Sequence, residues 1–165
     1  MAKISQIVIT AAGIVTYNPD SDRLKNNINA ISGQVKQVYC FDNGSANIEE
    51  IRTLCCQYEN VTIIENGKNS GIAEGLNQII REARKNEIAW LLTLDQDSVC
   101  PAKMIDTMLK YSDEENIVAI CPRIVDKRRP TEIQREEGTD RIDFCITSGC
   151  FVNTTECEKI GDFDS

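Results

Sequence analysis

Residues 90 to 98 of the chain read Trp90-Leu91-Leu92-Thr93-Leu94-Asp95-Gln96-Asp97-Ser98. The nearly continuous apolar run over 90–94 is typical of a strand that helices cover on both faces, as in parallel sheets. Two acidic residues follow at once, so they stand at the carboxyl end of that strand. In open α/β sheets this is the edge at which ligands bind. The segment therefore predicts a parallel sheet with a ligand site beside Asp95 and Asp97.

Three units of a strand followed by a helix precede this segment. Short runs rich in β-branched residues at 13–17, 38–41 and 61–64 predict the strands, and a stretch of helical period follows each of them. Alternation of this kind builds parallel sheets from β-α-β units. A fifth strand is expected at 118–121, and strand-like segments flank 147–149. The predicted fold class is therefore α/β, with a mostly parallel sheet flanked by helices.

The first residues of two helices carry more detailed expectations. Asn47 and Glu50 have the spacing of an N-cap and its capping box, so a helix is predicted to begin beside Asn47. In the following helix, Ile72 has helical spacing with Leu76 and Ile79. All three isoleucine and leucine side chains are therefore predicted to face the core.

The composition is that of an ordinary globular domain. The chain has 165 residues, of which 41% are hydrophobic and 27% are charged, and these values predict one folded domain over residues 1–165. The net charge is −8. This charge argues against nucleic acid as a partner, because phosphate backbones are bound by basic surfaces.

The numbers of cysteines and histidines limit which nucleophiles and metal sites the protein can have. Eight cysteines occur without a C-x-x-C pair, and no export signal precedes them, so we expect reduced thiols in a cytoplasmic protein. No run of about 20 apolar residues predicts a membrane span. Histidine is absent, which removes the Ser-His and Cys-His nucleophile systems and every imidazole metal site.

Asp95 and Asp97 are the best candidates for metal ligands. They lie two positions apart at the end of a strand, so both carboxylates could reach one cation. Ligation by oxygen alone favours Mg2+ or Mn2+ over zinc or copper. A cation held by two carboxylates keeps coordination positions for the phosphates of a substrate. The alternative interpretation is a pair of solvated acids, and the position after a buried strand favours the metal site.

Polar loops also follow the three earlier strands, at the same edge of the sheet. Asp42 could accept the imide N–H of uracil or thymine, or the N–H edge of guanine, although its sequence is also that of an ordinary Asx turn. Tyr17 could stack on a base or a sugar, or belong to the core. The loop from Asn69 to Gly71 opens a helix whose N-terminal amides could meet a phosphate, or its polar residues could cap the helix.

Four segments taken together resemble the family 2 glycosyltransferases: Val15-Thr16-Tyr17-Asn18-Pro19, Phe41-Asp42-Asn43-Gly44-Ser45, Asn69-Ser70-Gly71-Ile72-Ala73-Glu74-Gly75-Leu76-Asn77 and Leu94-Asp95-Gln96-Asp97-Ser98. The resemblance extends from Ile7 onward, and residues 90–98 look like the rhamnosyltransferase branch that builds bacterial surface polysaccharides. It implies a GT-A fold, a nucleotide-diphosphate sugar donor and inversion at the anomeric carbon. Among donors, dTDP-rhamnose is favoured and a UDP-sugar is the alternative. The implied cofactor is Mg2+ or Mn2+, held by Asp95 and Asp97.

The resemblance also implies roles for individual residues of this chain. Ser148 and Gly149 resemble a turn on the side of the acceptor, which would be a glycan or a lipid-linked molecule. The nucleotide would be held by residues from all four strand-end loops: Thr16, Tyr17, Asn18, Asp42, Asn69, Gly71 and Asp95.

The last residues resemble a segment close to the catalytic base of this family. Gly161-Asp162-Phe163-Asp164 matches the lead-in to that base, which would follow beyond Ser165. No catalytic residue is therefore assigned. The resemblance implies the N-terminal portion of a longer catalytic domain, which binds donor and metal but is expected to be inactive in transfer.

The run Lys127-Arg128-Arg129 is basic in an otherwise acidic chain. A solvated loop is the favoured interpretation. The alternative is contact with anionic lipid headgroups or a lipid-linked acceptor. That contact would bring a cytoplasmic protein to the inner face of the membrane as a peripheral protein.

Three other classes of protein compete with the transferase. Haloacid-dehalogenase-like phosphatases also place D-x-D after an apolar strand, but on the first strand of their core, whereas Asp95 follows three earlier units. A nucleotidyltransferase would need a glycine-rich loop with Arg and Lys where this chain has Asn18-Pro19-Asp20. A non-catalytic module that binds a sugar nucleotide would fit the same loops.

Overall fold

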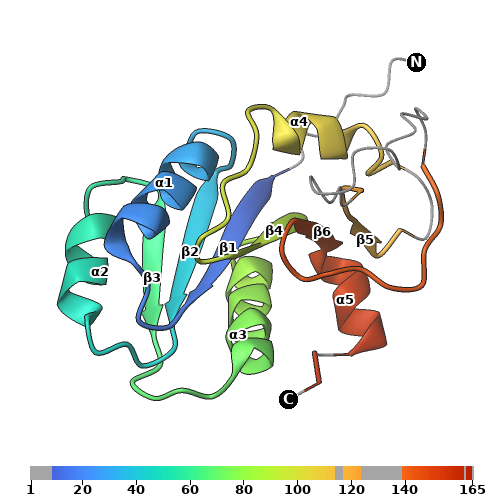
Figure 1. Ribbon diagram of the computed structural model, residues 1–165. Coiled ribbons are helices and arrows are strands. Elements are labelled where there is room, and N and C mark those ends of the chain that lie inside the picture. The colour runs from blue at the N-terminus through green and yellow to red at the C-terminus, as the bar shows by residue number, and fades with distance from the viewer. Residues whose placement is uncertain (1–8, 114–116, 124–138, 162, 165) are drawn as a thin grey trace, which may run out of the picture.

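A computed structural model describes residues 9–113, 117–123, 139–161 and 163–164. These residues form one sheet with helices on both faces (Figure 1). The strands are β1 (Thr10–Thr16), β2 (Gln37–Asp42), β3 (Val61–Glu65), β4 (Trp90–Asp95), β5 (Ala119–Ile120) and β6 (Cys150–Asn153). The helices are α1 (Ser21–Ser32), α2 (Ile48–Cys55), α3 (Ile72–Lys85), α4 (Met104–Leu109) and α5 (Thr154–Ile160).

The sheet has the strand order β3-β2-β1-β4-β6-β5. Strands β1 to β4 pair in parallel, and β6 runs antiparallel between β4 and β5. The mostly parallel α/β sheet predicted from the sequence is therefore confirmed. The order reverses at β1, whose neighbours are β2 on one side and β4 on the other. A crevice at such a reversal is where open α/β sheets bind their ligands.

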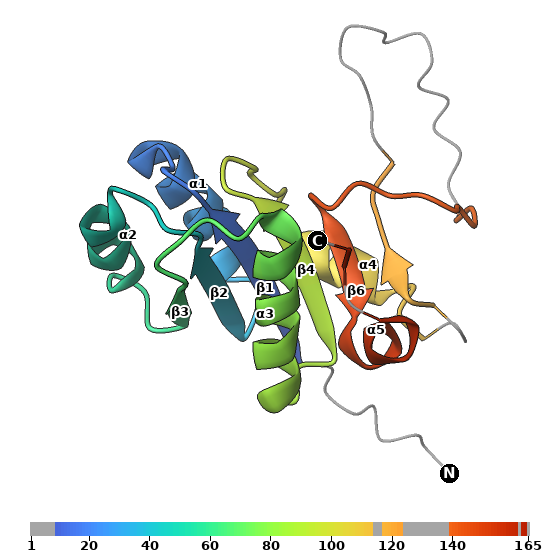
Figure 2. The same cartoon turned by 90° about the horizontal axis from the view of Figure 1, so that it is seen from below.

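Helices cover both faces of the sheet (Figure 2), and the apolar residues divide into two clusters. Helices α1, α2 and α4 cover one face, where Leu24, Ile28 and Ile31 of α1 are fully buried. Helix α3 covers the other face through Ile79, Ile80 and Ala83, together with α5. Consecutive residues of β4 belong to opposite clusters, so this strand is buried on both sides, as its apolar sequence predicts.

Two expectations about helix starts are wrong in their details. Ile72 is 61% exposed rather than buried, because it is the first residue of α3 and lines a surface cleft. Helix α2 does follow Asn47, but no capping box forms. The Asn47 side-chain amide donates to the Pro19 carbonyl, and the Glu50 carboxylate accepts from the Ser21 hydroxyl. Both side chains thus connect the start of α2 to the start of α1.

The later part of the chain is less regular than the first. The fifth strand forms at the expected place but is shorter, over Ala119–Ile120. Of the strand-like segments around 147–149, only the later one is a strand, β6. The basic run at 127–129 lies outside the described residues. None of the helices in the described ranges is long and apolar enough to cross a membrane.

All eight cysteines are free thiols in the structure. Cys55 is buried and Cys56 is exposed, although they are adjacent on the chain. Burial raises the pKa of the thiols of Cys100, Cys150 and Cys157. These thiols therefore stay protonated at neutral pH, which makes them poor nucleophiles and poor metal ligands.

Candidate functional site

A cleft of about 390 Å³ opens beyond the carboxyl ends of β1 and β4. It brings together predicted site residues from the loops after β1 and β3 and from the last residues of β1 and β4. These residues are Thr16, Tyr17, Asn69, Gly71 and Asp95. The structure adds Asn43, Ile72, Gln96 and Thr147 to the lining of the cleft. The predicted convergence of polar loops at this edge is therefore present.

The loop after β1 forms one wall of the cleft. Tyr17 is 47% exposed, so its ring is available to a ligand rather than buried in the core. Its backbone N–H donates to the Oε1 of Gln96 at 2.9 Å. Thr16 is fully buried, and its hydroxyl donates to the Phe41 carbonyl at 3.2 Å. Thr16 thus fixes the end of β1 against β2, while Tyr17 faces the cleft.

Asn18 does not line the cleft. It adopts a left-handed backbone conformation with φ of 46°. Its backbone N–H donates to the Ser45 hydroxyl at 2.9 Å, and its Oδ1 accepts from the Ala46 N–H at 2.8 Å. The Asn18 side chain therefore connects the loop after β1 to the loop after β2.

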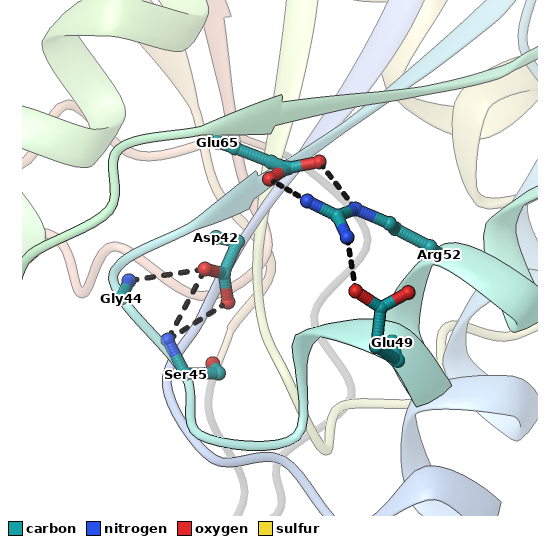
Figure 3. Close-up of polar contacts among 6 residues, drawn as sticks. All are labelled: Asp42, Gly44, Ser45, Glu49, Arg52 and Glu65. Carbon is teal, nitrogen blue, oxygen red and sulfur yellow. Dashed lines mark hydrogen bonds and ion pairs between the residues drawn. The ribbon is translucent and has the colours of Figure 1, made fainter.

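Asp42 ends β2 and is 2% exposed. Its carboxylate accepts the backbone N–H groups of Gly44 and Ser45, each at 3.1 Å to Oδ2, in an Asx-type turn (Figure 3). A carboxylate has about four acceptor positions, so these two donors leave capacity for a further one. Asp42 is not among the residues that line the cleft, whereas the next residue, Asn43, is.

An ion-pair network lies beside this turn (Figure 3). Arg52 of α2 contacts Glu65 at the end of β3 through both Nε, at 2.8 Å, and Nη2, at 2.6 Å. The same guanidinium also pairs with Glu49. The hydrogen bonds from Arg52 lower the pKa of the Glu65 carboxyl. The network joins the first turn of α2 to the neighbouring strand.

Asn43 connects the loop after β2 to the loop before α3. Its Oδ1 accepts the Ser70 N–H at 2.8 Å, and its Nδ2 donates to Asn69 Oδ1 at 3.1 Å and to the Gly71 carbonyl at 3.3 Å. Within the described part of the chain, no side chain caps α3, whose N-cap residue is Gly71 with φ of 86°. The uncapped helix start beside the cleft is suited to an anion, because N-terminal amides and the helix dipole both attract negative charge.

The loop after β4 presents its carboxylates to solvent. Asp95 is exposed, and the Asp97 side chain is 53% exposed with one ion pair, to Arg23 at 3.4 Å. The backbone of Asp95 is held on both sides: its N–H donates to the Ser148 hydroxyl at 3.1 Å, and its carbonyl accepts from Asn27 Nδ2 at 2.7 Å. The loop thus combines a fixed backbone with open carboxylates.

Asp95 and Asp97 fit a divalent cation that shares its coordination with a substrate. Over the described ranges, no group of three or more acidic, cysteine or histidine side chains is arranged to hold a metal ion. A site of two carboxylates is therefore incomplete by itself. Mg2+ and Mn2+ accept such sites when water and phosphate oxygens supply the other ligands.

The predicted acceptor-side residues lie directly beside this loop. The Ser148 and Ser98 hydroxyls are 2.8 Å apart, and the Gly149 N–H donates to the Thr93 carbonyl at 2.7 Å. Thr147 of the same turn lines the cleft. The turn before β6 is therefore hydrogen-bonded to the strand and the loop that carry the two aspartates.

Asn77 is a buried polar residue on the core-facing side of α3. Its Nδ2 donates to the Phe163 carbonyl at 3.0 Å, and its Oδ1 accepts the Phe163 N–H at 2.8 Å. Helix α3 thus holds the segment that resembles the lead-in to the family's base.

The sequence analysis did not predict roles for Asn27, Asn43 and Asn77. For Asn27 and Asn77, an asparagine at a helical position expected to be apolar was a usable signal.

The fold and the cleft define the class of protein. A mostly parallel sheet flanked by helices, with its cleft at the reversal of strand order, is the GT-A architecture of glycosyltransferases. The model of glycosyl transferase family 2 matches residues 12–159. The chain therefore belongs to glycosyl transferase family 2, as its sequence motifs indicate.

A curated relative extends this assignment. The chain is 30% identical over 128 residues to the dTDP-rhamnosyl transferase RfbF of Shigella flexneri, in a match that covers 70% of this chain and 38% of the relative. The chain thus spans well under half the length of that protein.

Solved structures share the fold at low sequence identity. The mannosyltransferase PcManGT from Pyrobaculum calidifontis, solved with GDP-Man and Mn2+, has a TM-score of 0.71 at 17% identity over 94% of this chain and 47% of its own. TarS of S. aureus, residues 1–349, has a TM-score of 0.64 at 14% identity, covering 92% and 49%. Glucosyl-3-phosphoglycerate synthase from Mycobacterium tuberculosis, solved with Mn2+, UDP and phosphoglyceric acid, has a TM-score of 0.53 at 16% identity, covering 70% and 43%.

Proposed function

We propose that this chain is the donor-binding part of an inverting rhamnosyltransferase that uses dTDP-rhamnose and a divalent cation. The observation that carries the proposal is the cleft itself, where the exposed Asp95 lies together with the start of α3. Asp97 follows two residues later and is also exposed, although it is not part of the cleft lining. The identity to a dTDP-rhamnosyl transferase supports dTDP-rhamnose over a UDP-sugar as the donor.

Asp95 and Asp97 would hold Mg2+ or Mn2+ on one side of the cleft. When bound, the cation would neutralise the diphosphate as it departs from the sugar. The protein has a net charge of −8, so a cation and the α3 amides offset repulsion that an anionic donor would otherwise meet. This explains how an acidic protein could bind a nucleotide diphosphate.

The nucleoside would lie against the loops after β1 and β2. The exposed ring of Tyr17 offers a stacking surface for the base or the deoxyribose. Asp42 is buried and outside the cleft lining, so it would act through its turn, in which its carboxylate holds the Gly44 and Ser45 amides in place. Asn18 would act indirectly, by keeping these two loops together.

The acceptor would approach from the turn of Ser148 and Gly149. We propose a glycan or a lipid-linked glycan in the synthesis of cell-surface polysaccharide, made at the cytoplasmic side of the membrane. Inversion requires a general base that takes the proton of the acceptor hydroxyl. No residue of this chain is assigned to that role, so the first experiment tests binding rather than transfer.

Calorimetric titration with dTDP, UDP and GDP, each with and without Mn2+, tests this function. We expect dTDP to bind in the presence of Mn2+, and the affinity to fall at least about tenfold, or 1.4 kcal/mol, in Asp97→Ala. Asp106→Ala, which removes an exposed acid from α4, is the matched control and should bind as the wild type does. Binding that is independent of Mn2+ and of Asp97 would contradict the proposal, and preference for GDP or UDP would change the donor.

A further inference from the structure

Asn27 is a polar residue on the buried face of α1, where the other residues are apolar. It has no exposed surface, and its neighbours on the buried face of α1 are Leu24, Ile28 and Ile31. Its side-chain Oδ1 is buried and has no hydrogen-bond partner among the residues that the structure describes. A buried polar atom without a partner destabilises a fold. The presence of an asparagine at this position is therefore better explained by a role other than stability.

Among the described residues, the Asn27 side chain makes one hydrogen bond, which goes to the backbone of Asp95. Its Nδ2 donates to the Asp95 carbonyl at 2.7 Å. That carbonyl already accepts the Ser98 N–H at 3.1 Å. The bond from Asn27 is thus not needed to satisfy the carbonyl. What it adds is a fixed position of the Asp95 peptide relative to α1.

The same peptide is fixed from its other side by the turn before β6. The Asp95 N–H donates to the Ser148 hydroxyl, which also contacts the Ser98 hydroxyl. Arg23, one turn before Asn27 on α1, pairs with Asp97. Helix α1 therefore contacts the backbone of one aspartate and the carboxylate of the other, while the carboxylate of Asp95 stays exposed.

We propose that Asn27 is a positioning residue for the divalent cation. It holds the Asp95 peptide so that both carboxylates converge on one ion, and it does so at the expense of the stability of the fold. The inference rests on the proposed function, because it presumes a cation at Asp95 and Asp97. Groups that orient metal ligands without touching the metal commonly set its affinity.

The test is Asn27→Leu, which keeps the branched shape of the side chain but removes both its polar atoms. We expect the Mn2+ affinity, measured by electron paramagnetic resonance of free Mn2+ in the presence of dTDP, to fall roughly tenfold. The urea midpoint should be unchanged or higher, because the unpartnered oxygen is gone. A purely structural role predicts the opposite pair of results, a lower midpoint with unchanged Mn2+ affinity.

Asn60→Leu is the matched control. Asn60 precedes β3, at the opposite edge of the sheet, and its Nδ2 donates to the carbonyls of Ser32 and Val35. This variant should have a lower urea midpoint and the Mn2+ affinity of the wild type. Wild-type Mn2+ affinity in Asn27→Leu would overturn the inference.

Two further measurements keep the outcomes separate. If Asn27→Leu does not fold, Asn27→Asp replaces it, since the aspartate has the same size and lacks the amide donor. If the wild type itself binds no Mn2+, the proposed function fails. Amide hydrogen exchange of residues 96–98 then tests whether Asn27 fixes this loop. Faster exchange in the variant supports the positioning role, and unchanged exchange overturns it.

Discussion

The loops after β2 and β4 both carry aspartates, and they use them in opposite ways. In the loop after β2, the Asp42 carboxylate is buried and accepts the backbone N–H groups of its own turn (Figure 3). In the loop after β4, the carboxylates of Asp95 and Asp97 are exposed. Other residues, Asn27 and Ser148, hold that backbone instead.

The difference shows how a fold keeps a charged side chain free for a ligand. A loop needs donors and acceptors to fix its backbone, and a carboxylate that supplies them has less capacity left for anything else. Where neighbouring elements supply them, the carboxylate stays open. We therefore expect changes in the β2 loop to reduce stability and changes at the β4 carboxylates to reduce binding.

The largest effect on stability is expected for Gly44→Ala. Gly44 has φ of 83°, and a Cβ there would lie 2.7 Å from the backbone of Lys68. Left-handed strain and the backbone clash together should lower the free energy of unfolding by about 3–4 kcal/mol, measured by urea denaturation. Gly67→Ala is the control, since Gly67 has φ of 69° with nothing near a new Cβ. It should lose only about 1 kcal/mol, and equal losses would show that the close approach to Lys68 has no effect.

The next effect separates the two kinds of aspartate directly. Asp42→Ala leaves the Gly44 and Ser45 N–H groups without their acceptor, so the free energy of unfolding should fall by about 2–3 kcal/mol. Asp97→Ala removes an exposed side chain with one exposed ion pair. This change should alter the free energy of unfolding by about 0.5 kcal/mol or less. Both values come from urea denaturation without metal. A large loss in Asp97→Ala would remove the distinction between the loops.

The smallest effect concerns the Arg52–Glu65 pair beside the Asp42 turn. Arg52 lowers the pKa of Glu65 below its ordinary value of 4.5, so the pair stabilises the fold above that pH and loses its effect as pH falls through the lowered pKa. Both side chains are partly exposed, so Glu65→Gln should lower the thermal midpoint at pH 7 by about 2 °C or less. The difference from the wild type should vanish under acidic conditions. If the thermal midpoints still differ at pH 3, the effect of Glu65→Gln comes from packing instead of charge.

Much of the fold could be predicted because its signals are local. The strands that became β1 to β4 are apolar runs that end at polar residues, and the stripe of Leu24, Ile28 and Ile31 marks α1. The convergence of Tyr17, Asn69 and Asp95 followed from the parallel sheet alone, because all the strands end at the same edge.

The features of the fold and site that could not be predicted depend on contacts between segments that are distant in the sequence. The antiparallel placement of β6 between β4 and β5 has no local signature in a strand of four residues. Ile72 fits a helical stripe, but the stripe cannot show that this first residue of α3 lines a cleft. Asn43 is part of an ordinary turn sequence, and only the fold reveals that its side chain bonds the loop before α3.

The pairing of Asn77 with Phe163 restricts the length of α3 more strictly than its composition. Gly71, at the start of the helix, borders the cleft, and Asn77 bonds the Phe163 peptide in both directions, as a neighbouring strand would. Each residue of an α-helix turns by about 100°. One residue inserted between these positions would rotate Asn77 away from Phe163 while leaving the helix intact. Most single substitutions in this stretch would leave that spacing unchanged, but an insertion or deletion within it would separate the cleft from the segment that α3 holds.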